Sequence, residues 1–444
     1  MGKLFGTDGI RGIYGKNLTN ATAYLLGRTL TEAEPNRAPL IVTGRDTRPS
    51  GKSLEGSFCY GVTSAGGQVL NLGILPVNAV SYYTRSFGAD YGVMFSASHN
   101  PPEYNGLKVF DAFGLKLCAE KEKALEMRMN RAEVSISEGF RCGNIPFENI
   151  AQNYAEILTA DVCDLSELFI VADCAFGSAF SVAERAFSLK NARAICRNNE
   201  NRGDRINRQC GATFPEFLKT QMPQGYDLGF AFDGDADRCV VLQGNRILDG
   251  NRLLYLIAKY LHETGRLHSQ TVVGTVLTNG GVERALATQG LTLHRADVGD
   301  KNVFAALTSQ KTTFGGEESG HYLFADRFSC SDGIYTALIT AQIYKEKGDL
   351  FEYSKEFRPI PSVQKNLPMS PSVLEQWNRE GFFPNLTEAL LQRFPTTKIL
   401  VRASGTEPQV RIFAESEDEA QNRYVTEYAE GLLLQNAAKN HGAR

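Results

Sequence analysis

Short apolar segments typical of strands alternate along this chain with helix-like stretches, and no other feature limits the fold as strongly. The first three apolar segments lie at residues 40–43, 69–72 and 91–95, and helical stretches at about 50–65 and 77–87 separate them. Strands that alternate with helices predict parallel βαβ units. The sequence therefore predicts an α/β fold.

The same pattern returns twice further along the chain. Strands are predicted at 168–173, 227–232, 271–276, 291–294 and 312–314, and helices at 178–187, 281–289 and about 331–347. Polar loops rich in Gly or Ser follow residues 95, 232 and 314. Because ligands bind at the carboxyl ends of parallel strands, we expect these three loops to face one cleft. The three segments share no sequence identity, so an internal repeat rests on the pattern alone.

The C-terminal part follows a different pattern. Residues 358–362 contain two prolines and are predicted to form a linker. Strands at 398–402 and 409–414 follow, and then a charged helix at about 417–436, which together indicate an α+β unit. A chain of 444 residues is also too long for one core, so about three domains or more are expected.

The composition excludes several classes of protein. Hydrophobic residues make up 42 % of the chain and charged residues 22 %, which is typical of a globular protein. A net charge of −3 means that the chain has no overall excess of basic residues for binding nucleic acid. No apolar run approaches the ~20 residues that span a bilayer, and the opening residues lack an apolar signal core. We expect a cytoplasmic protein with neither nucleic acid nor membrane as a partner.

The nine cysteines are odd in number, and no pair has CxxC spacing. This pattern favours buried free thiols in a reducing compartment over a zinc or redox site.

Ser98 is the first candidate for chemistry. The end of the predicted strand at 91–95 delivers it into a polar loop, with His99 beside it and Lys108 ten residues on. A hydroxyl in such a place is suited to carrying a group during a reaction. An ordinary turn is the alternative, because Ser and Asn beside Pro are common in turns.

Three carboxylates alternate with small residues directly after the predicted strand at 227–232, namely Asp233, Asp235 and Asp237. On an extended backbone, alternate side chains share one side. Carboxylates this close repel one another unless a cation lies among them, and a hard divalent ion such as Mg²⁺ prefers oxygen ligands. The sequence predicts a metal site with room for a phosphate on Ser98; an acidic hairpin turn is the alternative.

Residues 402–408 (Arg-Ala-Ser-Gly-Thr-Glu-Pro), followed by Arg411, contain the components of a phosphate cradle. Hydroxyls, glycine amides and a forked guanidinium all bind phosphate oxygens. The alternative is a β-turn with a surface arginine. The GxxxxGK[ST] pattern is absent, so nothing favours a nucleotide.

Three further segments carry weaker signals. Residues 316–321 (Gly-Glu-Glu-Ser-Gly-His) offer a carboxylate and a hydroxyl that could grip sugar hydroxyls, although a hairpin turn fits equally well. Residues 6–12 place Arg11 among glycines, as a phosphate contact would require. Residues 44–48 (Gly-Arg-Asp-Thr-Arg) stay ambiguous, because an Arg–Asp pair there could simply fix a loop.

Taken together, the chain resembles the α-D-phosphohexomutase superfamily over essentially its whole length. Within it, the chain is most similar to the bacterial phosphoglucosamine mutases. The resemblance rests on six ordered motifs at residues 1–12, 96–102, 233–238, 295–300, 316–321 and 402–408. The opening GTDGIRG and the Val-Gly-Asp at 298–300 favour this branch over the phosphomannomutase/phosphoglucomutase branch.

The resemblance implies four domains around a central cleft. Three would be related α/β units of sandwich type with mixed sheets, and the fourth a smaller α+β domain that binds phosphate. In this chain they would span residues 1–148 (phosphoserine loop), 149–249 (metal loop), 250–357 (sugar loop) and 363–444 (phosphate binding).

The resemblance also implies which residues act at the reacting end. Ser98 would be a phosphoserine. One Mg²⁺ per chain would be held by that phosphate together with Asp233, Asp235 and Asp237. Charge and proton handling would fall to Lys108, as a general acid/base, and to Arg238, His99, Arg11 and His321.

At the other end of the substrate, Glu317 and Ser319 would hold sugar hydroxyls. The residues implied to bind the non-reacting phosphate are Arg402, Ser404, Gly405, Thr406 and Arg411.

The chain departs from the usual pattern of the branch at three positions. Ala236 stands where a Gly is usual, and if that position needs φ > 0, the methyl group costs about 1 kcal/mol or more. Glu318 replaces a Gln and Ala403 replaces a Pro. The extra negative charge of Glu318 near the sugar puts the substrate preference in question.

The implied reaction interconverts glucosamine 6-phosphate and glucosamine 1-phosphate through a 1,6-bisphosphate, which would also serve as activator. Such a product would feed UDP-N-acetylglucosamine and cell-wall synthesis. The same chemistry on a 2-hydroxy hexose phosphate, a metal-dependent phosphatase and a sugar-phosphate binding protein are the alternatives. A small-molecule sugar phosphate is the expected partner, and the chain would be a monomer or homodimer.

Overall fold

The computed structural model describes residues 4–6, 8–34, 37–130, 143–144, 147–404 and 408–441. Met1–Thr278 together with Ala285–Phe357 forms one compact unit. Asn279–Arg284 together with Arg358–Arg444 forms a second. Gly405 and Thr406, predicted to bind phosphate, lie outside the described residues.

The first sheet of the larger unit has the strand order β1-β2-β6-β5-β3-β4-β7. Its strands are β1 (Phe5–Gly6), β2 (Gly9–Ile13), β3 (Leu40–Arg45), β4 (Gln68–Ile74), β5 (Tyr91–Phe95), β6 (Tyr104–Asp111) and β7 (Gly143–Asn144). Its helices are α1 (Asn20–Glu32), α2 (Gly51–Ser64), α3 (Val77–Ser86), α4 (Ala119–Met129) and α5 (Phe147–Thr159).

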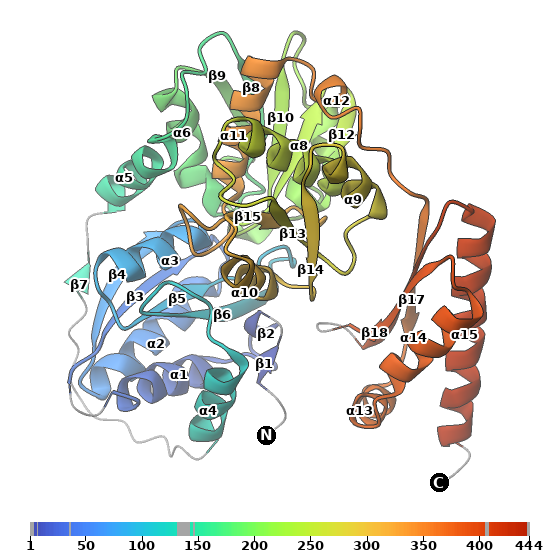
Figure 1. The fold of residues 1–444 in the computed structure, drawn as a ribbon. Helices are drawn as coiled ribbons and strands as arrows, with labels where there is room; N and C mark the ends of the chain where they lie inside the picture. The colour runs from blue at the N-terminus through green and yellow to red at the C-terminus, as the bar shows by residue number, and fades with distance from the viewer. Residues whose placement is uncertain are drawn as a thin grey trace. The chain divides into compact units, whose positions relative to one another are not determined.

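In this sheet β3 is parallel to both β4 and β5, which lie on its two sides. Right-handed crossovers to opposite sides place α2 and α3 on opposite faces of the sheet (Figure 1). β5 then pairs antiparallel with β6.

The second sheet has the order β12-β11-β10-β8-β9. Its elements are β8 (Phe169–Asp173), α6 (Ala183–Leu189), β9 (Arg193–Arg197), α7 (Glu216–Thr220), β10 (Leu228–Phe232), β11 (Cys239–Gln243) and β12 (Arg246–Leu248), with 3₁₀ turns at Ser178–Ser181, Gly203–Arg205 and Gly211–Thr213. β8 and β10 run parallel, and β10 pairs antiparallel with β11.

The third sheet has the order β14-β13-β15-β16. Its elements are α8 (Gly250–Glu263), β13 (Thr271–Thr275), α9 (Gly280–Ala287), β14 (Thr292–Ala296), α10 (Asp300–Gln310), β15 (Phe314–Gly316), β16 (Tyr322–Phe324), α11 (Gly333–Lys347) and α12 (Leu350–Tyr353). β13 and β15 run parallel, and β15 pairs antiparallel with β16.

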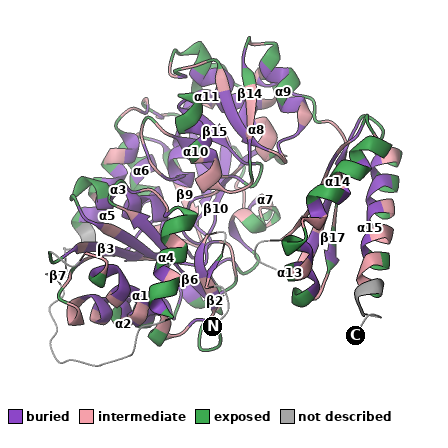
Figure 2. Cartoon of the chain, turned by 60° about the horizontal axis from the view of Figure 1, so that its bottom comes forward, coloured by how far each residue is buried: buried purple, intermediate pink, exposed green. Residues whose placement is uncertain are grey.

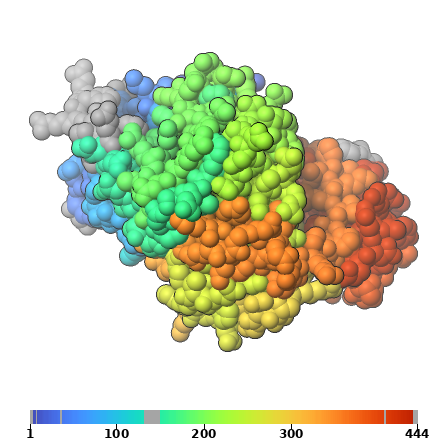
Figure 3. All heavy atoms as spheres, turned by 90° about the horizontal axis from the view of Figure 1, so that it is seen from above, coloured from blue at the N-terminus to red at the C-terminus, as the bar shows by residue number. Residues whose placement is uncertain are grey.

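The same arrangement therefore occurs once in each of the three sheets: a strand that is parallel to one neighbour is followed along the chain by a strand that pairs with it in the antiparallel direction. The connections β5–β6, β10–β11 and β15–β16 carry the three polar loops singled out in the sequence. The buried strands stand out in purple in Figure 2. The long helix α11 packs against β10, β11 and α8, and its segment (orange in Figure 3) borders the green and yellow surfaces of the second and third sheets.

The smaller unit is built on a three-stranded antiparallel sheet of order β17-β19-β18. Its elements are β17 (Ser362–Pro368), α13 (Pro371–Arg379), α14 (Phe382–Arg393), β18 (Lys398–Ala403), β19 (Gln409–Glu415) and α15 (Glu419–His441). Helices α14 and α15 pack on this sheet. Trp377 is buried and stacks on Phe382, with ring centroids 4.5 Å apart.

The α/β class is confirmed, and several predicted elements need correction. Each sheet of the larger unit combines parallel and antiparallel strands, which confirms the mixed sheets that the resemblance implied. The helix predicted at 178–187 is a 3₁₀ turn followed by α6, the strand predicted at 312–314 begins at Phe314, and the last helix extends to His441. The predicted boundaries at 148 and 249 stay predictions, because the larger unit is one compact body.

The cysteines of the described residues are all free. Cys142 lies outside the described residues. No helix of the described part of the chain is long and apolar enough to cross a membrane.

Candidate active site

Ser98 lies in the β5–β6 loop with its hydroxyl buried against the aspartate loop of the second sheet. Its Oγ donates to Asp233 Oδ2 at 2.7 Å, and the residue is 2 % exposed. The backbone φ of Ser98 is 49°, in the left-handed region that side chains with a Cβ rarely adopt. Ser98 N donates to Ser96 Oγ at 2.8 Å, and Ser96 in turn donates to Asp46 at 2.7 Å. The loop therefore fixes a strained serine against a carboxylate.

A fully buried arginine holds this loop from behind. Arg48 pairs with Asp46 at 2.9 Å. Its guanidinium also donates, at 2.5 to 2.9 Å, to the carbonyl oxygens of Ser98, Asn100, Pro101 and Tyr104. Asn207 Nδ2 adds hydrogen bonds to the carbonyls of Ser98 and Asn100 at 2.8 and 3.0 Å.

The sequence left Arg48 ambiguous and did not identify Asn207. The sequence did contain one signal for Arg48, namely the Arg–Asp pair directly after β3. Because β3 lies next to β5 in the sheet, residues that follow β3 come close to the Ser98 loop that follows β5.

The aspartate loop brings its carboxylates together by turning, which corrects the predicted extended backbone. Ala236 N donates to Asp233 O at 3.1 Å, and Ala236 has a φ of 60°. The position therefore does require the left-handed conformation for which the sequence raised a strain penalty. A side chain at Gly234 would place its Cβ 2.6 Å from Ser98 O, so glycine permits the close approach of the two loops.

The three carboxylates fit a divalent cation. Ligand oxygens of Asp233, Asp235 and Asp237 all lie within 4.8 Å of one another, and all three residues are buried. Asp235 Oδ1 is buried with no hydrogen-bond partner among the described residues. Burial and the charges of Asp237 and Asp235 raise the pKa of Asp233 to about 7. Such a cluster is stabilised by a hard cation with oxygen ligands.

Lys108 lies beside these carboxylates. Its Nζ is 2.8 Å from Asp235 Oδ2, 3.2 Å from Asp237 Oδ2 and 2.9 Å from Asp8 Oδ2. Burial alone would lower the pKa of Lys108, but the three carboxylates outweigh it and the pKa is raised well above its usual value. Lys108 therefore stays an ammonium in this network, which favours a role as a fixed positive charge and makes it a weak proton donor.

His321 joins the sugar loop to the aspartate loop. Its Nε2 lies 3.1 Å from Asp237 Oδ1, and its Nδ1 lies 3.3 Å from Glu317 Oε2. Burial alone would lower the pKa of His321, but Asp237 and Glu317 raise it to about 10. The imidazolium therefore donates from both nitrogens, and Glu317 keeps a lowered pKa although it is buried.

The remaining predicted residues of the larger unit lie around Ser98. Arg238 Nε is 3.8 Å from Asp233 Oδ2 and 3.2 Å from His321 Nε2. Arg11 donates to Asn100 Oδ1 and to Asp8 Oδ2, both at 2.9 Å. The structure thus brings the phosphoserine, metal and sugar loops together.

His99 and Ser319 are placed less tightly. His99 Nδ1 is 3.4 Å from Ser98 Oγ, and burial with the charges of Arg238 and Arg11 lowers the pKa of His99 to about 3. His99 is therefore neutral. Ser319 is exposed and its Oγ lies 3.2 Å from His321 Nδ1.

The described residues predicted to bind phosphate in the smaller unit lie at the end of its sheet where β18 connects to β19. Arg402 on β18 and Arg411 on β19 are direct partners across the antiparallel pair, where like charges destabilise each other. Ser404 Oγ, which follows β18, is buried without a hydrogen-bond partner among the described residues. Paired guanidinium groups with a buried hydroxyl are suited to an anion.

Curated relatives match this chain over nearly its full length. The phosphoglucosamine mutase of Clostridium kluyveri is 37 % identical over 439 residues, which cover 95 % of this chain and 96 % of that protein. The chain belongs to the phosphoglucosamine mutase family. The family models for phosphoglucomutase/phosphomannomutase match it in three places: alpha/beta/alpha domain I at residues 2–135, alpha/beta/alpha domain III at 249–359 and the C-terminal domain at 372–430.

Solved structures share the phosphohexomutase fold with this family member. A phosphoglucomutase/phosphomannomutase family protein of Burkholderia thailandensis superposes with a TM-score of 0.80 at 24 % identity, covering 96 % of this chain and 95 % of that one. The N-acetylphosphoglucosamine mutase of Aspergillus fumigatus, in complex with GlcNAc-6P and magnesium, superposes with a TM-score of 0.67 at 18 % identity, covering 98 % and 96 %.

Proposed function

We propose that this member of the phosphoglucosamine mutase family interconverts glucosamine 6-phosphate and glucosamine 1-phosphate, with Ser98 as the phosphate carrier. The observation that carries the proposal is the contact between Ser98 Oγ and Asp233 Oδ2 at 2.7 Å, within a cluster of three buried carboxylates. A phosphoserine there would have a bound cation as its charge partner, and the full-length similarity to phosphoglucosamine mutases favours a sugar over water as the acceptor.

The first half-reaction transfers the phosphoryl group from phospho-Ser98 to the sugar O1. The Oγ–P bond breaks, the O1–P bond forms, and the hydroxyl proton finishes on Ser98 Oγ. After the 1,6-bisphosphate has turned end over end, Ser98 Oγ attacks the phosphorus of the 6-phosphate. The Oγ–P bond forms, the O6–P bond breaks, and the Ser98 proton passes to O6. The protein contributes mainly by positioning and charge stabilisation, as is general for phosphoryl transfer.

Asp233, Asp235 and Asp237 would hold one Mg²⁺, which when bound neutralises charge on the phosphoryl oxygens. Arg238 and Lys108 add positive charge at the same place, and the raised pKa of Lys108 supports a permanent charge there. His321 links the metal loop to Glu317 and has its own proton to donate. Arg11 and His99 complete the surroundings of the phosphate.

Glu317 and Ser319 would hold the sugar hydroxyls. The distal phosphate would be bound by Arg402, Ser404, Gly405, Thr406 and Arg411. The cross-strand pairing of Arg402 and Arg411 supports this role, because two arginines at opposite positions can offer several donors to one anion. The sugar 1,6-bisphosphate is proposed as the intermediate and, when added, as the activator that phosphorylates Ser98.

A 2-hydroxy hexose phosphate is the second candidate substrate. The exposed carboxylate of Glu318 follows Glu317 directly in the sugar loop, and the matching family models also describe phosphoglucomutases and phosphomannomutases. The chemistry would be unchanged, and only the contact to C2 would differ.

The test is a coupled assay of the protein phosphorylated on Ser98 with the 6-phosphates of glucosamine, mannose and glucose. We expect the highest kcat/KM with glucosamine 6-phosphate, and loss of turnover when divalent metal is removed. A higher kcat/KM with mannose or glucose would select the second candidate. Steady release of inorganic phosphate in step with substrate loss would contradict both mutase assignments.

A further inference from the structure

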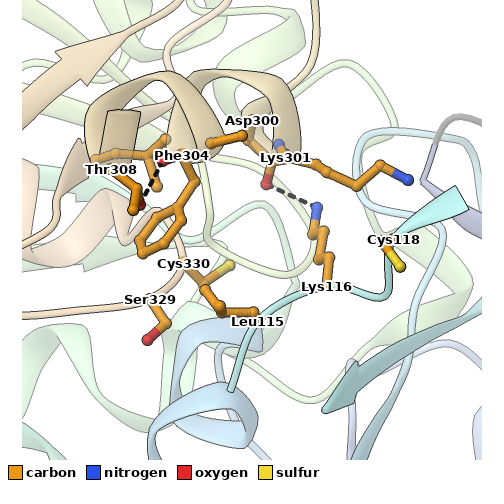
Figure 4. A pocket seen from close by; sticks show the side chains of 11 residues that line it. Leu115, Lys116, Cys118, Asp300, Lys301, Phe304, Thr308, Ser329 and Cys330 are labelled. Atoms are coloured by element: carbon orange, nitrogen blue, oxygen red, sulfur yellow. Dashed lines mark hydrogen bonds and ion pairs between the residues drawn. The ribbon is translucent and has the colours of Figure 1, made fainter. Parts of the chain in front are cut away.

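Two lysines connect the first and third sheets of the larger unit, and they do so differently. Lys116, in the turn after β6, lies between two carboxylates: its Nζ is 2.6 Å from Asp8 Oδ1 and 2.7 Å from Asp300 Oδ2. Lys301, the next residue after Asp300, reaches Leu117 O at 3.3 Å and Glu122 Oε2 at 3.2 Å. Figure 4 shows the Lys116–Asp300 pair with Lys301 directed away from it.

The two carboxylate partners of Lys116, Asp8 and Asp300, each connect it to residues of the active site. At one end, Asp8 Oδ2 lies 2.9 Å from Lys108 Nζ, and Lys108 contacts the carboxylates of Asp235 and Asp237. Lys301 has no contact of this kind among the described residues, because its partners belong to the start of α4 and to the segment between β6 and α4.

At the other end, Asp300 begins α10 directly after Gly299. Gly299 has a φ of 120°, and its N–H donates to Glu317 Oε1 at 2.8 Å. Glu317 is the buried carboxylate of the sugar loop, and its Oε2 lies 3.3 Å from His321 Nδ1. Because Gly299 is bonded directly to Asp300, the position of Asp300 determines the position of the Gly299 N–H that orients Glu317.

These contacts close into a ring. It runs from Asp237 through Lys108, Asp8, Lys116 and Asp300, and returns by way of Gly299, Glu317 and His321 to Asp237. Opposite charges alternate from Asp300 through Lys116, Asp8, Lys108, Asp237 and His321 to Glu317, and the neutral amide of Gly299 closes the ring between the two carboxylates at its ends. Lys116 is the member that joins the phosphoserine sheet to the sugar loop.

Val303 packs the first turn of α10 into the core of the third sheet, but a pocket lies on the side of this turn that faces Lys116. A cavity of about 360 Å³ lies against Lys116, Asp300 and Lys301, and its other lining is formed by side chains such as Leu115, Phe304 and Leu323. On this side, the Lys116–Asp300 pair and the contacts of Lys301 both link the first turn of α10 to the first sheet. Of these two links, only the Lys116 pair continues through Asp8 to Lys108.

We infer that Lys116 and Asp300 are positioning residues that set Glu317 for the sugar, by fixing the Gly299 amide relative to the phosphoserine and metal loops. The inference rests on the proposed function, because Glu317 is assigned there to the sugar hydroxyls. It explains the Val-Gly-Asp motif at 298–300, which the proposed chemistry leaves without a role.

The experiment compares Lys116→Met, Lys116→Arg and Asp300→Asn with Lys301→Met as the matched control. Each protein, phosphorylated on Ser98, is assayed with the hexose 6-phosphate on which the wild type is fastest, so a different sugar preference does not affect the comparison. KM, kcat, the Mg²⁺ concentration for half activity and the phosphorylation of Ser98 by the bisphosphate are measured. Lys116→Met and Asp300→Asn both break the Lys116–Asp300 ion pair, so either variant tests the inference if the other does not fold.

We expect Lys116→Met and Asp300→Asn to raise KM by about 10-fold or more, the scale on which partners that orient a ligating group act. The phosphorylation of Ser98 and the Mg²⁺ requirement stay as in the wild type. Lys116→Arg recovers most of the KM, because its guanidinium can still bridge two carboxylates. Lys301→Met leaves KM unchanged.

A double variant separates positioning from general loosening. If Lys116 acts through Glu317, Lys116→Met in a Glu317→Gln background raises KM no further than Glu317→Gln alone. An unchanged KM in the single variants, an equal rise in Lys301→Met, additive effects in the double variant, or a loss confined to kcat or Ser98 phosphorylation would each overturn the inference. Absence of wild-type turnover on every hexose phosphate would instead overturn the proposed function.

Discussion

The aspartate loop of the larger unit and the arginine pair of the smaller unit both gather like charges, but they handle them in opposite ways. Asp233, Asp235 and Asp237 are buried, and Lys108 and His321 already offset much of their charge within the fold. Arg402 and Arg411 instead face each other across two antiparallel strands. The first site is organised by protein contacts before substrate arrives, whereas the second is suited to an anion that completes it. We therefore expect changes in the first site to affect the fold and kcat, and changes in the second to affect KM.

The largest effect is expected for Arg48→Met, which removes the guanidinium behind the Ser98 loop. Loss of one partner of a buried ion pair costs about 3–5 kcal/mol in the free energy of unfolding, and here several carbonyls lose their donor as well. Urea unfolding of the variant measures this cost. Arg202→Met is the control, since its exposed pair with Asp204 is expected to contribute about 1 kcal/mol or less. Equal stability of the two variants would mean that the Ser98 loop does not depend on Arg48.

Arg411→Gln tests the other side of the comparison. Removing one charged hydrogen-bonding group from a phosphate site costs about 1.5–3 kcal/mol, which corresponds to a KM for sugar phosphate raised roughly 10- to 100-fold. We expect the variant to change the melting temperature of the free protein much less than Arg48→Met does. Arg423→Gln on α15, whose partner is Glu419, is the matched control. A large loss of kcat at unchanged KM would show that the two sites do not divide their roles in this way.

Ala236→Gly sharpens the comparison by measuring strain stored in the aspartate loop. Ala236 has a φ of 60°, and relief of this conformation should stabilise the protein by about 1 kcal/mol. The control is Ala305→Gly, at an exposed helical position of α10, where glycine should destabilise by about 1 kcal/mol. Thermal unfolding of both variants gives the two signs, and a loss of stability in Ala236→Gly would show that the loop is not strained there.

The smallest effect concerns Glu55, which is buried near Arg45 and Thr43. Burial raises the pKa of Glu55 above its unfolded value, although Arg45 partly offsets this. A raised folded pKa gives stability that is present below the unfolded pKa, about 4.3, and is lost as pH rises through the folded value. The melting temperature of Glu55→Gln relative to the wild type should therefore increase from pH 4.5 to pH 8. A difference that stays constant over this range would mean that Glu55 has no raised pKa.

Much of the strand framework could be predicted because buried parallel strands are short apolar runs. The segment predicted at 91–95 is the whole of β5, with Val93, Met94 and Phe95 buried. The antiparallel neighbours were harder to predict. β6 and β11 include charged or polar side chains such as Lys108 and Gln243, and their pairing depends on the sheets that they complete.

The site could be predicted where one segment carries the chemistry, as with Asp233, Asp235 and Asp237. Contacts between distant segments left no local pattern. The four carbonyls that Arg48 binds lie 50 to 56 residues away along the chain. The extended aspartate loop was a wrong prediction because alternation cannot reveal that Ala236 is left-handed. The roles assigned to Gly405 and Thr406 stay predictions.

Ser98 is proposed to carry a phosphoryl group to and from a sugar. The most direct measurement phosphorylates Ser98 with a ³²P label, mixes the protein with unlabelled glucosamine 6-phosphate and Mg²⁺, and follows the label in a rapid-quench experiment. We predict that the label leaves Ser98 and passes first into the hexose bisphosphate and then into hexose monophosphate, with Ser98→Ala taking up no label. Label that stays on the protein during turnover, or that appears directly as inorganic phosphate, would contradict the account.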